Sequence, residues 1–347
     1  MQNTATVIND LHIGTLRSAG TTPATAYELR RNLLFNMQGL LSMADDTDLL
    51  VLGDLFDTPN IPLSDLFATV MQFTDWLRRN PNSHLWLPPG NHDLSKNSQT
   101  YTSFDTLAAL LQASFEGRVH VPRIGESMGN GMWVLGHVAN QDIFELELSR
   151  VPTDTKYLFL HCNYSNNFAA KSDHSLNLSE DQTKTLPAQH IFIAHEHQQK
   201  VSLGGKVVVI GNQFPSSVSD CLGNATKRAV VVSEAGYQSI QTWSAGEDFA
   251  QLDWQLLEDT GASFIRVIGK ASAAEGAAVV AAISKLRQAS KALVITNAVE
   301  IEGETNEAEI ALTMEKLNSF DVMTELMKLF NEEEKAVITG LLEKNSV

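Results

Sequence analysis

The sequence of 347 residues predicts an α/β fold, and two observations support this prediction. Near the start of the chain, three apolar runs typical of buried strands each end at a polar cluster, and helical patterns stand between them. From about Gly125 onward the apolar runs are shorter and β-like, which indicates a second sheet. Since α/β proteins carry active sites at the carboxyl ends of their strands, a second sheet packed on the first would bring the polar clusters to one edge.

The first sheet is predicted from strands that are each followed by a polar cluster. These are Thr4–Asn9 with Asp10-Leu-His12, Leu49–Leu52 with Gly53-Asp54-Leu-Phe-Asp57, and Leu85–Leu87 with Gly90-Asn91-His92-Asp93. Between them, Tyr27–Met43 and Asp65–Arg79 have apolar residues at helical spacing. The alternation of strand and helix predicts a mainly parallel sheet.

The second sheet is predicted from five shorter segments. They are Met132–Leu135, Tyr157–Leu160, His190–Ala194, Lys206–Ile210 and Ala229–Val232. Two of the segments end in histidine motifs, Leu160-His161 and Ala194-His195-Glu-His197. The sequence therefore places imidazoles at strand ends of this sheet.

The last hundred residues predict two further parts. Strand, alanine-rich helix and strand are expected at Ser263–Lys270, Ala273–Gln288 and Ala292–Ile301, as a small α/β unit. The tail Asn306–Asn345 is expected to be helical, with an apolar stripe. The expected domains are 1–245, 250–303 and a tail at 304–347.

Composition limits the classes of function. The net charge of −16 weighs against nucleic-acid binding through overall electrostatics, although the last 48 residues, with twelve acidic and four basic side chains, carry half of it. A local basic groove elsewhere stays possible. The two cysteines form no CxxC pair, which fits a reducing compartment. No signal peptide or membrane span is recognised, so we expect a cytoplasmic protein with no membrane contact.

The polar clusters predict a pair of metal ions. The expected ligands share carboxylate, amide or imidazole donors, and they are Asp10, His12, Asp54, Asn91, His161, His195 and His197. Hydrolysis of a phosphodiester needs a nucleophile at neutral pH and cations near the phosphoryl oxygens, and two metals roughly 4 Å apart supply both. Asp54 suits the shared position, because a carboxylate has two oxygens. The mixed N/O set favours Mn²⁺, with Fe²⁺ or Zn²⁺ as alternatives.

His92 is the expected catalytic residue. It adjoins the ligand Asn91, so it should lie beside the phosphate without binding a metal, where a protonated imidazole can stabilise charge and assist the leaving oxygen. Each motif alone has a simpler explanation, such as a turn, but five clusters in one order favour a site. The remaining histidines are expected to be surface or core residues: His84, His120, His137, His174 and His190.

In order, DxH, GDxxD, GNHD, a lone histidine and xHxH make the chain resemble the calcineurin-like metallophosphoesterases from Met1 to about Asp220. The resemblance implies a four-layer αββα sandwich. It implies one metal on Asp10, His12, Asp54 and His197, another on Asp54, Asn91, His161 and His195, and catalysis by His92. Ala194 stands where the family usually has glycine.

Gly53-Asp-Leu-Phe-Asp57-Thr-Pro resembles the nuclease subunit of SbcCD-type recombination and repair complexes, including phage versions, and Gly211-Asn-Gln-Phe-Pro-Ser-Ser agrees with it. That resemblance implies a Mn²⁺-dependent DNA exonuclease and endonuclease, with 250–303 as its capping domain. It also implies a homodimer through helices near Asp65–Arg79, and an SMC-like coiled-coil ATPase as partner of the tail.

Two other functions remain open for the sequence. The same metal core would serve a small-molecule phosphodiesterase or a protein phosphatase. An inactive scaffold for the ATPase is the third hypothesis, and the full ligand set argues against it. If the protein is encoded by a phage, the expected location is the host cytoplasm.

Overall fold

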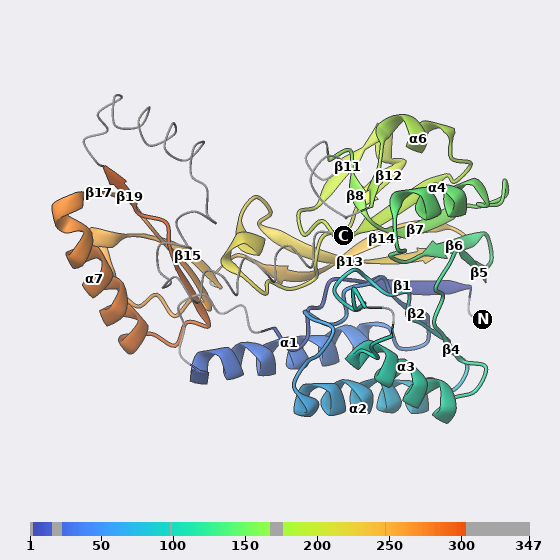
Figure 1. The fold of residues 1–347 in the computed structure, drawn as a ribbon, viewed down its shortest axis with the longest axis horizontal. Coiled ribbons are helices and arrows are strands. Elements are labelled where there is room, and N and C mark those ends of the chain that lie inside the picture. Colours follow the sequence, from blue (N-terminus) through green and yellow to red (C-terminus); the bar gives the residue numbers. More distant parts are fainter. Residues whose placement is uncertain (1–2, 16–22, 98, 167–175, 247, 303–347) are drawn as a thin grey trace, which may run out of the picture. The chain divides into compact units, whose positions relative to one another are not determined.

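A computed structural model of the chain describes residues 3–15, 23–97, 99–166, 176–246 and 248–302 (Figure 1). The chain divides into two compact units. The first comprises Met1–Gly269 and Ala277–Val299, and the second Lys270–Gly276 and Glu300–Val347. The division expected from the sequence, at 1–245, 250–303 and 304–347, stays a prediction, and the tail lies outside the described residues.

The first sheet has six strands in the order β14-β13-β1-β2-β3-β4. Their bounds are β1 Thr4–Ile8, β2 Asp48–Val51, β3 Leu85–Trp86, β4 Val119–His120, β13 Thr226–Ser233 and β14 Gly236–Ser244. Strands β1 to β4 run parallel, whereas β13 pairs antiparallel with β1 and forms a hairpin with β14. The expectation that Ala229–Val232 belongs to the second sheet is therefore wrong. Val7 pairs with Val230, so this late strand closes an edge of the first sheet.

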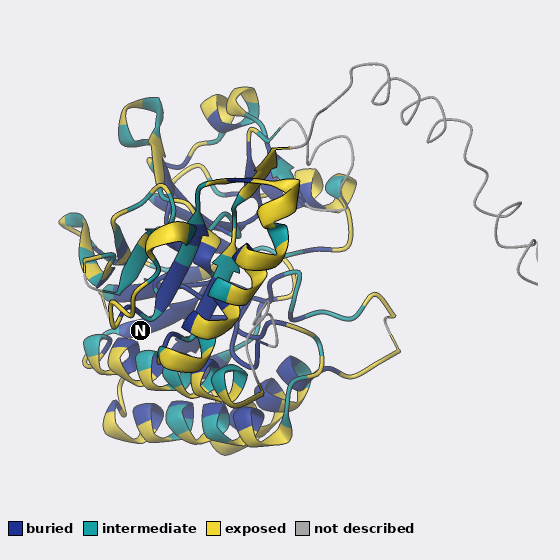
Figure 2. Cartoon of the chain, turned by 90° about the vertical axis from the view of Figure 1, so that its left-hand side faces the viewer, coloured by how far each residue is buried: buried dark blue, intermediate teal, exposed yellow. Residues whose placement is uncertain are grey.

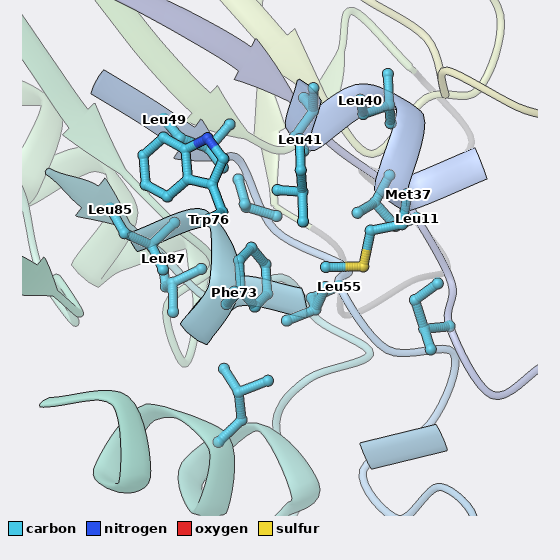
Figure 3. Close-up of a cluster of buried hydrophobic side chains, with 14 of the residues drawn as sticks. Leu11, Met37, Leu40, Leu41, Leu49, Leu55, Phe73, Trp76, Leu85 and Leu87 are labelled. Carbon is cyan, nitrogen blue, oxygen red and sulfur yellow. The ribbon is translucent and has the colours of Figure 1, made fainter. Parts of the chain in front are cut away.

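Three helices cover the outer face of the first sheet: α1 Pro23–Met43, α2 Leu63–Arg79 and α3 Ser103–Ser114 (Figure 1). Phe73 and Trp76 of α2 are buried in one apolar cluster with Leu49 and Leu85 of the strands (Figure 3). Helix α3 starts at a capping box, in which Thr102 accepts from the backbone N–H of Asp105.

The second sheet has the order β11-β12-β10-β7-β6-β5. Its strands are β5 Glu126–Gly129, β6 Met132–Leu135, β7 Tyr157–His161, β10 His190–Ala194, β11 Lys200–Ser202 and β12 Val207–Val209. Helices α4 Gln141–Ser149 and α6 Glu180–Thr185 lie against its outer face, where Phe144 and Leu148 join a buried cluster. A short pair, β8 Asn163–Tyr164 with β9 Asn177–Leu178, and the turn η1 Leu203–Gly205 complete this part.

Between the two sheets lies a third apolar cluster. Val7 and Leu50 of the first sheet share it with Phe159 and Phe192 of the second. The central strands β1, β2, β7 and β10 are accordingly buried on both faces, while the helices expose one side to solvent (Figure 2). The order helix, sheet, sheet, helix confirms the predicted αββα sandwich.

A small parallel sheet, β15-β16-β18, follows the hairpin. The elements here are η2 Val218–Cys221, β15 Phe249–Asp253, η3 Trp254–Leu256, β16 Phe264–Ile268, α7 Gly276–Ala289 and β18 Val294–Asn297. Phe264 and Val294 pack on Val218 of η2 and Leu29 of α1 in one buried cluster. These strands of the first unit thus share a core with the sandwich.

In the second unit, β17 Lys270–Ser272 pairs in parallel with β19 Glu300–Glu302, and η4 Ala273–Glu275 follows β17. Lys270 Nζ lies 2.9 Å from Glu302 Oε1. Within the ranges that the structure describes, no helix is long and apolar enough to span a membrane.

Candidate metal centre

The predicted ligands follow strands of both sheets. Asp10 comes after β1, Asp54 after β2 and Asn91 after β3, while His161 ends β7 and His195 follows β10. Parallel strands present their carboxyl ends at one edge, and the two sheets here present theirs side by side. All seven predicted ligands lie at this edge.

One group consists of Asp10, His12 and His197, whose ligand atoms all lie within 4.8 Å of one another. The Nε2 atoms of His12 and His197 are 3.0 Å apart. Two ring nitrogens from different sheets therefore point at one position, together with a carboxylate.

A second group consists of Asp54, His161 and His195, again with ligand atoms within 4.8 Å. Asn91 joins it, because its Oδ1 lies 3.2 Å from His161 Nε2. Asp54 is buried, and the pKa of its carboxyl is lowered: burial opposes this shift, and His161 and His12 cause it. One histidine of each group thus acts on Asp54, as a shared position between the groups requires.

His12, Asp57 and His92 form a third possible group. His12 Nδ1 lies 3.2 Å from Asp57 Oδ1, so the opposite nitrogen of the ring, Nε2, faces His197. His92 Nδ1 donates to the backbone oxygen of Asp57 at 2.6 Å. Asp57 therefore orients two imidazoles, which fits a supporting role beside the first group better than a third metal.

The buried donors fit a divalent cation. Asp10 is 2% exposed, and its Oδ1 has no hydrogen-bond partner among the described residues. A buried carboxylate oxygen without a partner costs several kcal/mol, a cost that a bound cation removes. Carboxylate, amide and imidazole without thiolate form the donor set that Mn²⁺, Fe²⁺ and Zn²⁺ accept.

The surroundings shift the pKa values of two predicted ligand histidines in opposite directions. Burial lowers the pKa of His161, but the Asp54 carboxylate outweighs it and raises the value to about 9. Burial and His161 lower the pKa of His195 to about 4. His195 is therefore neutral at pH 7, as a metal ligand must be, whereas His161 must give up a proton on binding.

The backbone at the site is strained. Asp10, His12 and Asp54 have left-handed φ angles of 50°, 47° and 48°, and His195 has 88°. Such angles cost non-glycine residues of order 1–3 kcal/mol each and concentrate at functional sites. Their presence at four predicted ligands indicates that the fold holds these side chains in place for function.

Glycines allow the backbone to approach ligand side chains closely. At Gly90 an added Cβ would lie 2.1 Å from Asp54 Oδ1, and at Gly53 it would lie 2.2 Å from His161 Nδ1. By contrast, Ala194 is fully buried in the cluster between the sheets and has no left-handed φ. The methyl group at this position therefore leaves the ligand arrangement intact.

Several supporting residues were missed by the sequence reasoning. Asp93 accepts from the backbone N–H of Phe56 and Gly90, both at 2.9 Å, and links the loops after β2 and β3. Burial and Asp54 raise the pKa of Asp93. The position of Asp93 inside GNHD was the available signal.

An amide pair joins the two sheets. Gln213 Oε1 accepts from the N–H of Asn9 at 2.7 Å, and Gln213 Nε2 donates to Asn9 Oδ1 at 3.0 Å. Asn9 Nδ2 in turn donates to Asp10 Oδ2 at 2.5 Å, and the N–H of His195 donates to the same oxygen at 3.0 Å. One carboxylate oxygen of Asp10 is thus fixed, and the other, Oδ1, would be available to hold a metal ion.

Residues that were predicted to lie outside the metal site make other contacts. Cys162 is buried, and burial raises the pKa of its thiol. Glu196 Oε1 accepts from the N–H of Tyr164 at 2.8 Å. His84 and His120 bond to each other at 2.9 Å, outside the metal groups. His174 lies outside the described residues.

An αββα sandwich with two clusters of candidate metal ligands at its edge is an arrangement suited to a metal-dependent hydrolase. The sequence profile described as calcineurin-like phosphoesterase matches residues 4–223, so the chain belongs to this family of metal-dependent phosphoester hydrolases. A search of curated proteins finds no match.

Among solved structures, the crystal structure of the protein TT1561 from Thermus thermophilus is similar to this chain. The match has 12% sequence identity and a TM-score of 0.39, and it covers 69% of this chain and 99% of the other. At that score it adds nothing to the functional argument.

Proposed function

We propose that the protein is a Mn²⁺-dependent DNA exonuclease and endonuclease that works with an SMC-like coiled-coil ATPase. The observation that carries the proposal is the small sheet beyond the family match. Its strands β16 and β18 pack on η2, which lies next to the metal centre through a bond from His197 to Asp220. A second surface beside the metals suits a polymer with several phosphates.

This second surface offers a phosphate contact. A cavity of about 260 Å³ is lined by Arg266, by the hydroxyl residues Ser217, Ser219 and Thr296, and by the apolar residues Val218, Leu222 and Val294. Arg266 forms no ion pair with a described acidic residue. A guanidinium among hydroxyl groups is a typical partner for a phosphate of a nucleic-acid backbone.

The site residues would act as follows. Asp10, His12 and His197 would hold one metal, Asn91, His161 and His195 the other, and Asp54 both. Bound metals would supply a nucleophile at neutral pH and neutralise charge on the phosphoryl oxygens.

His92 has its place fixed by two bonds. Its N–H donates to Asp54 Oδ1 at 2.9 Å, and its Nδ1 donates to Asp57 O. Its Nε2 is then the atom that can pass a proton to the leaving oxygen.

Unlike Arg266, three arginines of the helical layer already form ion pairs with acidic side chains. They are Arg30, Arg31 and Arg79.

The predicted homodimer is supported by an exposed apolar stripe on α2. Leu63, Phe67 and Met71 recur every fourth residue and are 77%, 63% and 40% exposed, and Phe35 of α1 is 72% exposed. An apolar stripe on neighbouring helices is typical of a helix–helix interface between copies. Phe67→Asp should convert a dimer to a monomer in light scattering, and a wild-type monomer would exclude the interface.

The ATPase partner remains a proposal from the sequence, because the tail lies outside the described residues. Deletion of residues 304–347 should abolish co-purification with a co-expressed SMC-like coiled-coil ATPase and leave metal content unchanged. Co-purification of the deleted chain would place the contact elsewhere.

Cleavage of DNA is tested with purified full-length chain and Mn²⁺. Linear single- and double-stranded DNA should be degraded, with and without the ATPase. Arg266→Ala should lower kcat/KM on DNA by about tenfold, the loss of one charged hydrogen bond, and affect hydrolysis of bis(p-nitrophenyl) phosphate less. Turnover of a cyclic nucleotide or phosphopeptide with no DNA cleavage would instead support the small-molecule phosphodiesterase or phosphatase alternative, which the net charge of −16 favours.

A further inference from the structure

His197 needs support that its own segment does not provide. It lies past the end of β10, outside any strand or helix, and its side chain is 23% exposed. Two contacts from distant parts of the chain hold it. Its Nδ1 donates to Asp220 Oδ1 at 2.7 Å, and its backbone oxygen accepts from Lys227 Nζ at 2.9 Å.

Asp220 is held in place by hydrogen bonds other than the one to His197. It is 3% exposed, and its Oδ2 accepts three hydrogen bonds, from Ser216 N–H at 2.9 Å, Ser216 Oγ at 3.0 Å and Ser217 N–H at 3.0 Å. Only Oδ1 is directed at the imidazole. The carboxylate therefore fixes both the ring orientation and the tautomer of His197, with the proton on Nδ1 and the lone pair on Nε2.

Lys227 is fully buried, which is rare for lysine. The pairing of β13 with β14 is irregular between Lys227 and Arg228, as in a β-bulge. Bulges redirect side chains and are frequent near active sites. Since an ammonium group in the interior is costly unless it is bonded, its position under the His197 carbonyl indicates a specific role.

We propose that Asp220 and Lys227 are positioning residues for His197, so that the metal at Asp10, His12 and His197 depends on them. The metal at Asp54, His161 and His195 does not, because His161 Nδ1 bonds instead to the backbone oxygen of Leu52 at 3.0 Å. A carboxylate behind a ligand imidazole orients it and raises its basicity. The inference rests on the metal site and is independent of DNA as the substrate.

The experiment is a Mn²⁺ titration of metal-free full-length protein, with free Mn²⁺ followed by electron paramagnetic resonance and bound metal counted after desalting. Wild type should bind two ions. Asp220→Asn should weaken one of the two by about 10–100-fold, the range for partners of ligand histidines. After desalting it should therefore keep one ion per chain.

Lys227→Met keeps the length of the side chain and removes the donor, and it should weaken the same single site by a smaller factor. Asp65→Asn is the matched control, because Asp65 is a buried carboxylate that pairs with Arg30 at 3.2 Å on the helical layer. It should retain two ions with wild-type affinity, even where its melting temperature falls.

Two results would overturn the proposal. If Asp220→Asn and Lys227→Met both bind two ions with wild-type affinity, these residues have a purely structural role. Equal weakening of both metals in folded variants, judged by circular dichroism, would remove the link to one site. The titration contains no DNA, so a failure of the nuclease proposal leaves its outcome unaffected.

Discussion

The two sheets contribute unlike halves to the metal centre. The first sheet supplies all the oxygen donors, from Asp10, Asp54 and Asn91, whereas the second supplies imidazoles only. The carboxylates therefore come from one side of the centre, and three of the four predicted ligand imidazoles, those of His161, His195 and His197, come from the other. A cation placed between them is held by charge from the first sheet and by directed lone pairs from the second.

The supports of the two halves also differ. Asp93, which braces the first half, stands within the same short motif as Asn91 and bonds to Gly90, three residues away. In the second half, His197 is braced by Asp220 and Lys227, which come 23 and 30 residues later. The loop that carries Asn91 is thus braced from within its own motif, whereas His197 depends on residues that reach it only in the completed fold.

The largest expected effect removes the charge at the centre of this arrangement. Asp54→Asn should lose both metals, because the amide keeps the shape but lacks the charge that offsets repulsion between two cations. Hydrolysis should fall to the background of the assay. Metal analysis after desalting measures the change, and two retained ions would contradict the shared position of Asp54.

A methyl group at Gly90 should disturb the first half from within. In Gly90→Ala the new Cβ would meet Asp54 Oδ1 at 2.1 Å, so the loop must shift and metal binding should be lost. Gly39→Ala is the control, since no atom lies within 4 Å of the corresponding position in α1. Normal metal content in Gly90→Ala would show that the first half tolerates movement.

Removal of the proton-transfer group should leave both halves intact. His92→Ala is expected to bind two metals and to lose about 10²–10⁴ in kcat, the usual contribution of a general acid. Initial rates on bis(p-nitrophenyl) phosphate and metal content are measured together. Unchanged turnover would exclude His92 from the mechanism.

The smallest effect concerns a histidine outside the centre. Burial and His84 lower the pKa of His120 to about 4, so the folded state resists a proton that the unfolded chain accepts below about pH 6.5. The contribution of His120 to the free energy of unfolding should therefore be lost as the pH falls from about 6.5 to 4.

His120→Phe preserves stacking on Trp86, where the ring centroids are 4.0 Å apart. Between pH 7 and pH 4.5, the melting temperature of His120→Phe should fall by about 2–4 °C less than that of the wild type. This difference corresponds to about 1 kcal/mol in a large domain, after a discount for solvent screening. Identical losses in both proteins would assign the effect to other groups.

The sequence predicted most of the first half because its ligands follow apolar strands within short motifs. In the second half, the sequence predicted the ligands but not the residues that hold them in place. Nothing near Asp220 or Lys227 in the sequence indicates their bonds to His197, since contacts across 23 and 30 residues are set by packing. Similarly, β13 was assigned to the wrong sheet, because apolar periodicity predicts a strand and does not identify its neighbour.

The pairing of β1 with β13 also sets an order for synthesis. β1 leaves the ribosome more than 200 residues before its partner strand, since Val7 pairs with Val230. At translation rates of about 5–20 residues per second, this edge stays open for roughly ten seconds or more. The same late strand brings Lys227 to His197, so the nascent chain completes its metal centre only when the hairpin has been made.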